Sequence, residues 1–140
     1  MPTRPPRLIH LMSLAQHRLL KSTDTAFDKA VGITVTQLGV LFILEQNPGA
    51  LLKDVSEALG INKSATTALV DRMETASLVR RQASEDDGRA VCLYATRSGL
   101  SKAVAARPIL SSLNAQLTDG FTERELATVE RFLRAILERF

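Results

Sequence analysis

Apolar residues recur every three or four positions over most of this chain, which predicts a mainly α-helical fold. The first such segment begins near Leu8, after an arm at 1–7 whose three prolines and two arginines predict extended or disordered chain. Its apolar pattern weakens toward Val31 and stops at Gly32. We therefore predict one long first helix between Leu8 and Val31.

The second predicted helix begins with a recognisable cap. Thr34 and Gln37 form a T-x-x-Q capping box, and Ile33 can pack against Leu38 as a hydrophobic staple. The apolar pattern then continues to Asn-Pro-Gly at 47–49, which favours a turn. A helix between Thr34 and this turn is expected.

A short third helix and a fourth helix follow, with only three residues between them. The inward positions of the third helix are Leu52, Val55, Ala58 and Leu59, and the outward ones are Lys53, Asp54, Ser56 and Glu57. Gly60 suits a left-handed C-cap, and Asn62 is the natural N-cap of the helix that runs from Lys63 to about Ala76. Two helices joined by a short turn that contains glycine are typical of a helix-turn-helix.

The fourth helix has an apolar side and a small polar side when its residues are placed about 100° apart. The predicted inward residues are Ala65, Ala68, Leu69, Met73 and Ala76. The opposite side carries Lys63, Thr66, Thr67, Val70 and Glu74, with Ser64 and Asp71 at its edge. Short hydroxyl side chains allow a helix backbone to approach base edges and phosphates in a major groove. This side is therefore the expected DNA contact.

An extended pattern replaces the helical one after Leu78. Segments 78–81 and 90–95 are predicted strands, and the segment between them holds an Asp-Gly pair that favours a hairpin. A hairpin directly after a helix-turn-helix is a wing. Arg89, just past its tip, is placed where the negative potential of a narrow minor groove would attract it.

Two more helices complete the chain. Thr96 opens one that Pro108 is expected to kink or interrupt. The last helix starts at a T-x-x-E capping box, Thr122 with Glu125, and continues to the C-terminus.

The first and last helices carry apolar stripes that need a partner. Their principal residues are Leu8, Leu11, Leu126, Val129, Leu133, Ile136 and Phe140. One solution is a two-fold dimer in which these helices interleave, and the other is that they pack back on their own domain. The dimer is favoured because the last stripe reaches the final residue with no later element to cover it.

Composition limits the class of protein. The chain of 140 residues is 45% hydrophobic and 24% charged, which suits one folded domain. It has no apolar run near the roughly 18 residues of a membrane span, no recognisable signal peptide and a single cysteine, so a cytoplasmic protein without disulfides is expected. No set of nucleophile, base and orienting residues and no metal-ligand cluster is apparent, so neither an enzyme nor a cofactor or metal site is expected.

Charge adds little to the argument for nucleic acid. The net charge is +3, and residues 53–97 hold seven basic and seven acidic side chains. A DNA-binding function must therefore depend on where individual cations lie. A winged helix that binds another protein and not DNA is the alternative, because a neutral lobe suits either function.

The motifs together resemble the MarR family of multiple-antibiotic-resistance regulators. The resemblance covers residue 8 to the C-terminus and is most specific in NKSATTALVDRMETASLVRR and EDDGRAVCLYATRSG. Ser77 stands where the family often has glycine, and Gly88 where it often has a basic residue. With three acidic residues at 85–87, the latter change predicts weaker non-specific attraction to phosphate.

The resemblance implies a single domain over 1–140, a homodimeric winged helix-turn-helix regulator of transcription that binds double-stranded DNA. Residues 8–31 and 98–140 would form the dimerisation helices, and 34–97 the DNA-binding lobe. The implied DNA-binding residues are Lys63, Ser64, Thr66, Thr67, Arg72 and Arg89. Asp71 would pair with Arg89 to orient the wing. A small aromatic or amphipathic effector would lie near Leu11, His17, Phe42 and Leu100, although apolar residues there are more often core.

Each of three further side chains has two possible roles. His10 and His17 lie seven residues apart on one helix face, where they could bind a metal or sense pH, but no third ligand is near, so a surface or interface role is favoured. Cys92 could be a redox sensor, as in the peroxide-sensing branch of the family. Its apolar neighbours favour an unreactive thiol.

Overall fold

The computed structural model describes residues 6–86 and 88–140. Within these ranges the fold has six helices and a small antiparallel sheet, which confirms the mainly α winged-helix prediction. Two compact units divide the chain, one ending at Arg107 and the other spanning Pro108–Phe140. The expectation for the arm at 1–7 concerns mostly residues outside the described ranges.

Helix α1 (Leu8–Val31) begins and ends where the sequence predicts. Gly32 terminates it with a φ of 69°. Of its residues only Thr23 and Phe27 are buried, so most of the helix surface stays exposed. The Lys102 ammonium donates to the Val31 carbonyl at 2.6 Å, which satisfies a carbonyl at the end of α1.

Helix α2 (Val35–Gln46) is the centre of the core. Both hydrogen bonds of the Thr34–Gln37 capping box are present, as predicted. Its buried residues are Leu38, Val40, Leu41 and Leu44. Because these side chains point to more than one side, α2 is enclosed by the elements around it, as expected for a helix that is apolar on all faces.

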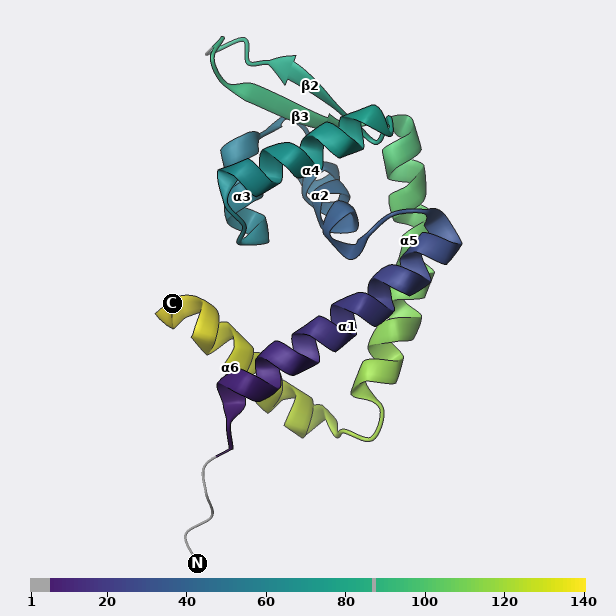
Figure 1. Cartoon of the computed structure of the whole chain (residues 1–140), viewed down its shortest axis with the longest axis vertical. Coiled ribbons are helices and arrows are strands. Elements are labelled where there is room, and N and C mark those ends of the chain that lie inside the picture. Colours follow the sequence, from purple (N-terminus) through teal and green to yellow (C-terminus); the bar gives the residue numbers. More distant parts are fainter. Residues whose placement is uncertain (1–5, 87) are drawn as a thin grey trace, which may run out of the picture. The chain divides into compact units, whose positions relative to one another are not determined.

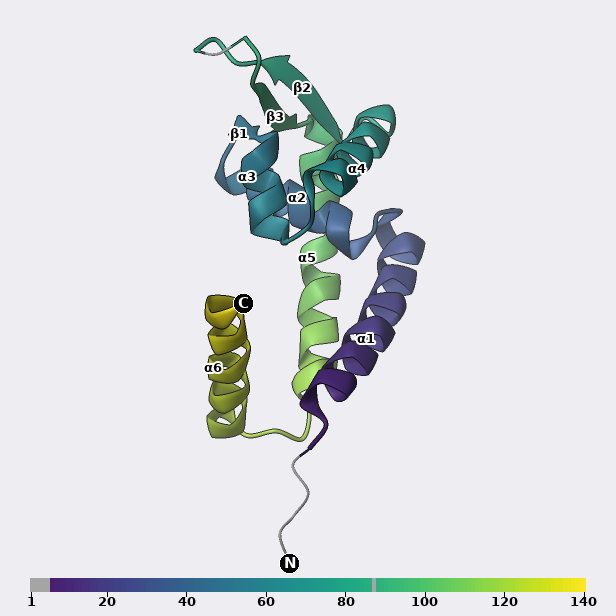
Figure 2. The same ribbon diagram turned by 60° about the vertical axis from the view of Figure 1, so that its left-hand side comes forward.

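The sheet contains one strand that the hydrophobic pattern does not predict. Strands β2 (Val79–Ala83) and β3 (Val91–Ala95) form the predicted hairpin, with Arg81 opposite Leu93. Strand β1 (Ala50–Leu51) pairs with the other edge of β3, so the order is β1-β3-β2 (Figure 2). The sheet thus connects the hairpin to the start of α3 (Leu52–Leu59).

Helix α5 (Arg97–Thr118) contains Pro108 without being interrupted by it. Gly99 packs so tightly that an added Cβ would lie 2.2 Å from the Leu78 carbonyl oxygen, so only glycine fits at this position. Helix α6 (Glu123–Arg139) has the predicted Thr122–Glu125 capping box. Its apolar stripe is described below.

Ser77, in the turn before β2, has a left-handed backbone with a φ of 59°. The turn is closed by the Leu78 N–H, which donates to the Met73 carbonyl, and by the Thr96 hydroxyl, which donates to the Ser77 carbonyl at 2.6 Å. The conformation that glycine would supply is therefore kept with serine in its place.

Replacing Ser77 with glycine is expected to increase the free energy of unfolding by about 0.5–1 kcal/mol. A left-handed non-glycine residue costs about 1–2 kcal/mol, and the greater freedom of glycine in the unfolded chain offsets about half of that gain. Urea unfolding measures the difference. The control S77A keeps the left-handed strain and should show no gain; equal stabilisation by both variants would contradict this explanation.

Candidate nucleic-acid interface

The helix-turn-helix is formed by α3 and α4 (Lys63–Thr75), which are labelled together in Figures 1 and 2. Gly60 ends α3 with a φ of 67°, and its N–H donates to the Glu57 carbonyl. The Asn62 side chain accepts from the Ala65 N–H at 2.7 Å and so caps α4, as predicted. Backbone conformation and capping therefore define both ends of the turn.

The buried side of α4 differs from the predicted one. The buried residues are Thr66, Leu69, Val70 and Met73, whereas Ala65, Ala68 and Ala76 are exposed. The helical pattern alone predicts the opposite, with Thr66 and Val70 outward and the three alanines inward. Alanine buries too little apolar surface to determine which side faces the core, whereas the larger Val70 gains more from burial. In α3, similarly, Ser56 is buried and Ala58 is exposed.

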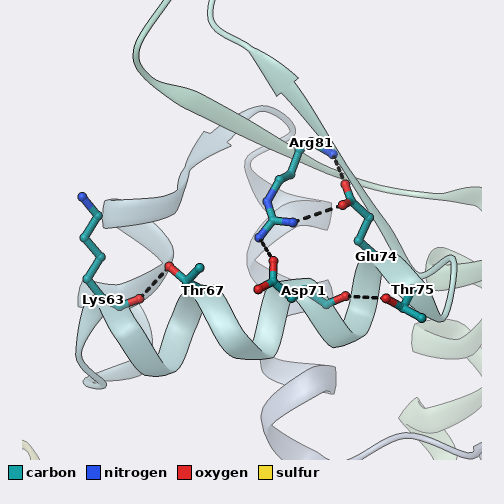
Figure 3. A network of polar contacts seen from close by, with 6 residues as sticks. All are labelled: Lys63, Thr67, Asp71, Glu74, Thr75 and Arg81. Carbon is teal, nitrogen blue, oxygen red and sulfur yellow. Dashed lines mark hydrogen bonds and ion pairs between the residues drawn. The ribbon is translucent and has the colours of Figure 1, made fainter.

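The predicted DNA-binding residues are therefore not all available. Lys63, Ser64 and Arg72 on α4 are exposed, and so is Arg89 at the start of the segment that leads into β3. Thr67 is partly buried, and its hydroxyl donates to the Lys63 carbonyl at 2.9 Å (Figure 3). Thr66 is fully buried, so its prediction as a direct DNA contact is wrong.

A hollow of about 320 Å³ lies between α3, α4 and the wing. Its lining includes three cationic side chains from different segments: Lys53 in the first turn of α3, Lys63 at the start of α4, and Arg89. The sequence pattern does not single out Lys53, because only the fold brings it beside the other two. Three cations at one site make this part of the surface locally positive, although the lobe as a whole is neutral.

Arg81 connects the wing to α4 (Figure 3). Its guanidinium donates to Asp71 at 2.5 Å and to Glu74 at 3.1 Å, and its backbone N–H donates to Glu74 at 3.2 Å. Burial lowers the pKa of Arg81, but the hydrogen bonds and charges of the two carboxylates outweigh burial and raise the pKa above its ordinary value. The ion pair of Asp71 is thus with Arg81, and the pair with Arg89 that the family resemblance implies is wrong.

The residues predicted to form a dimer interface expose apolar surface. Leu8, Leu11, Val129 and Leu133 are between 43% and 52% exposed, and Phe140 is completely exposed. Leu126 and Ile136 are partly buried. These stripes, on α1 in one unit and on α6 in the other, are more apolar surface than a soluble helix normally leaves uncovered.

The residues predicted to line an effector pocket come from three helices of one unit. Leu11, His17 and Leu100 are exposed, and Phe42 is partly buried, with the Arg107 guanidinium 5.7 Å from its ring centroid. Arg107 also forms an ion pair with Glu45. A ligand site at these residues stays a prediction.

His10 and His17 lie exposed on α1, and Cys92 lies on β3. Among the described residues, no group of three or more His, Cys, Asp or Glu side chains is arranged to hold a metal ion. Cys92 is partly buried on β3, opposite Gln82.

No single helix in the described part of the chain is long and apolar enough to cross a membrane. Only α1 and α2 taken together reach the necessary length and composition, and they are bent by 70° at the turn between them.

Comparison with protein families gives a match to the MarR family over residues 31–90. The chain is 26% identical over 132 residues to the multiple antibiotic resistance protein MarR of Escherichia coli, a match that covers 94% of this chain and 89% of that protein. It is 33% identical over 66 residues to the uncharacterised HTH-type transcriptional regulator YfiV of Bacillus subtilis. That second match covers 47% of this chain and 41% of YfiV.

Solved structures show the same fold. The Staphylococcus aureus MepR–DNA complex superposes with a TM-score of 0.85 at 22% identity, over 94% of this chain and 96% of MepR. PcaV of Streptomyces coelicolor, in complex with its natural ligand, superposes with a TM-score of 0.82 at 22% identity, over 98% of this chain and 94% of PcaV.

Proposed function

We propose that this chain, which is similar to the MarR family of transcriptional regulators, is a cytoplasmic repressor of that family. It binds double-stranded DNA sequence-specifically as a homodimer on a pseudo-palindromic operator, and a small molecule modulates the binding. It performs no catalysis. The observation that carries this proposal is the cationic hollow of Lys53, Lys63 and Arg89 beside the exposed side of α4.

The proposed contacts divide into two kinds. Lys53, Lys63 and Arg89 neutralise backbone phosphates or enter the minor groove, which supplies affinity but little sequence information. The exposed side of α4, with Ser64, Arg72 and the small residues between them, faces the base edges of a major groove. The complex of MepR with DNA supports DNA as the partner of this fold.

Dimerisation supplies the second half-site. We expect the exposed stripes of α1 and α6 to be covered by the same helices of a second copy. Two α4 helices then enter successive major grooves about 34 Å apart. A ligand that fits one spacing of the two lobes better than the other shifts the population between them, and PcaV with its natural ligand supports such an effector.

A winged helix that binds a protein partner is the second candidate, because residues 53–97 carry equal numbers of basic and acidic side chains. Selection of bound duplexes from a random pool, followed by affinity measurements at increasing salt, separates the two functions. DNA binding requires an enriched sequence with two-fold symmetry and an affinity that falls steeply with salt. Absence of enrichment would favour the protein partner.

Replacing Arg89 with alanine is expected to lower affinity for the selected operator about 10-fold, because a minor-groove or phosphate contact is lost. Fluorescence anisotropy with a labelled duplex measures the change, and sedimentation shows whether the dimer persists. R18A, which removes an exposed arginine from α1, is the matched control and should leave the affinity unchanged. Unchanged affinity in R89A itself would remove the wing from the mechanism.

A further inference from the structure

Two buried hydroxyl groups close the turn between α3 and α4. Ser56 Oγ donates to Thr66 Oγ1 at 2.7 Å, and Thr66 Oγ1 donates to the Asn62 carbonyl at 2.9 Å. Thr66 is fully buried, and Ser56 is 7% exposed. The Ile61 N–H donates to the Ser56 carbonyl at 3.3 Å across the same turn. The C-terminal half of α3 is thus tied to the first turn of α4.

The hydroxyl pair is not needed to fill space. Leu69, Val70 and Met73 bury the rest of the same side of α4, and valine at position 66 would occupy nearly the same volume as threonine. Apolar contacts are non-directional and tolerate some rotation of one helix against another. A hydrogen bond between two buried hydroxyls does not tolerate such a rotation. It weakens steeply as its angle departs from linear, and it leaves a costly unpaired group when it is broken.

We propose that the Ser56–Thr66 hydrogen bond fixes the rotation of α4 on α3 and so determines which side chains of α4 meet the DNA bases. This inference rests on the proposed function. A rotation of about 20° moves an atom about 6 Å from the helix axis by about 2 Å, which is more than a base-edge hydrogen bond tolerates. Thr66 is therefore a positioning residue: it acts on specificity through exposed neighbours such as Ser64 and Arg72, without touching DNA.

The experiment compares T66V, T66S, S56A and the double variant S56A/T66V with the wild-type chain. For each, anisotropy at fixed salt gives the ratio of affinities for the selected operator and for an unrelated duplex. Thermal unfolding and sedimentation report stability and dimerisation. T66S is the conservative control, because it keeps the hydroxyl group.

T66V is expected to reduce the specificity ratio at least about 10-fold, while affinity for the unrelated duplex changes less than about threefold, because phosphate contacts tolerate the rotation. T66S stays within about threefold of the wild type. The double variant removes donor and acceptor together, so its unfolding midpoint recovers relative to T66V. Its specificity ratio stays low, which a purely stabilising role would not produce.

Two results would overturn the inference: an unchanged ratio in T66V, or a ratio in S56A/T66V that recovers together with the unfolding midpoint. If T66V does not fold, the specificity ratios of S56A and of the double variant still test the inference, since both variants lack the hydrogen bond. A wild-type chain that does not distinguish the two duplexes would overturn the proposed function itself. If the wild-type chain is specific and its variants keep that specificity, only the inference about the hydrogen bond fails and the proposed function stands.

Discussion

Replacing Arg81 with glutamine is expected to lower operator affinity at least about 100-fold, equivalent to about 3 kcal/mol, because two carboxylates beside the DNA would lose their counter-charge. Asp71 is 59% exposed and Glu74 45% exposed in their side chains, so both are accessible to a phosphate that approaches α4. The wing would also lose its ion-paired connection to α4. Folding stability should change little, since ion pairs this exposed contribute about 1 kcal/mol or less.

Arg80 provides the matched control for this prediction. It is the preceding residue on β2, points to the other side of the sheet, and stacks on Tyr94 with its guanidinium 4.3 Å from the ring centroid. R80Q removes the same charge and is expected to change operator affinity less than about threefold. Equal losses in R80Q and R81Q would mean that net charge alone matters. Adding D71N and E74Q to R81Q should restore part of the affinity, which measures the repulsion separately from the lost connection.

Replacing Leu133 with aspartate is expected to weaken dimerisation at least about 1000-fold, because a carboxylate buried in an apolar interface without a partner costs several kcal/mol. The two-fold axis repeats this penalty in the second copy. Leu133 lies in the apolar stripe of α6 and is 46% exposed in the single chain. Sedimentation equilibrium should change from twice the chain mass of 15.3 kDa to that mass itself, and operator binding should be lost with it.

The variant A127D, on the same helix, separates this effect from the cost of placing aspartate in a helix. Ala127 is exposed on α6 and lines a shallow hollow with the polar side chains Glu130, Arg131, Arg134 and Glu138. The A127D substitution therefore introduces the same charge as L133D, but on the polar side of the helix. A127D should remain dimeric. Dimers that persist in L133D, or dissociate equally in A127D, would exclude the α6 stripe as the interface.

The elements that could be predicted from sequence are those with local causes. The Thr34–Gln37 and Thr122–Glu125 boxes define helix starts through hydrogen bonds within four residues, and both are present. Gly32 and Gly60 end their helices for a similarly local reason, since each adopts a left-handed backbone. The hairpin likewise follows from the change of hydrophobic period.

What could not be predicted depends on contacts distant in sequence. Strand β1 has only two residues and exists because β3, about 40 residues later, supplies its hydrogen-bond partners. The rotation of α4 depends on Ser56, whose hydroxyl makes Thr66 suitable for burial. Arg81 and Arg89 are both wing arginines, and only the strand register shows that Arg81 lies on the side of β2 that faces α4.

The central claim is that this chain binds a specific duplex as a dimer through α4 and the wing. The most direct test is sedimentation equilibrium of the wild-type chain with its selected operator over a range of salt concentrations. Two chains per duplex are expected. The logarithm of the association constant should fall linearly with the logarithm of the salt concentration, with a slope of about −0.9 for each phosphate neutralised. One chain per duplex, or an affinity that depends on neither sequence nor salt, would contradict the account.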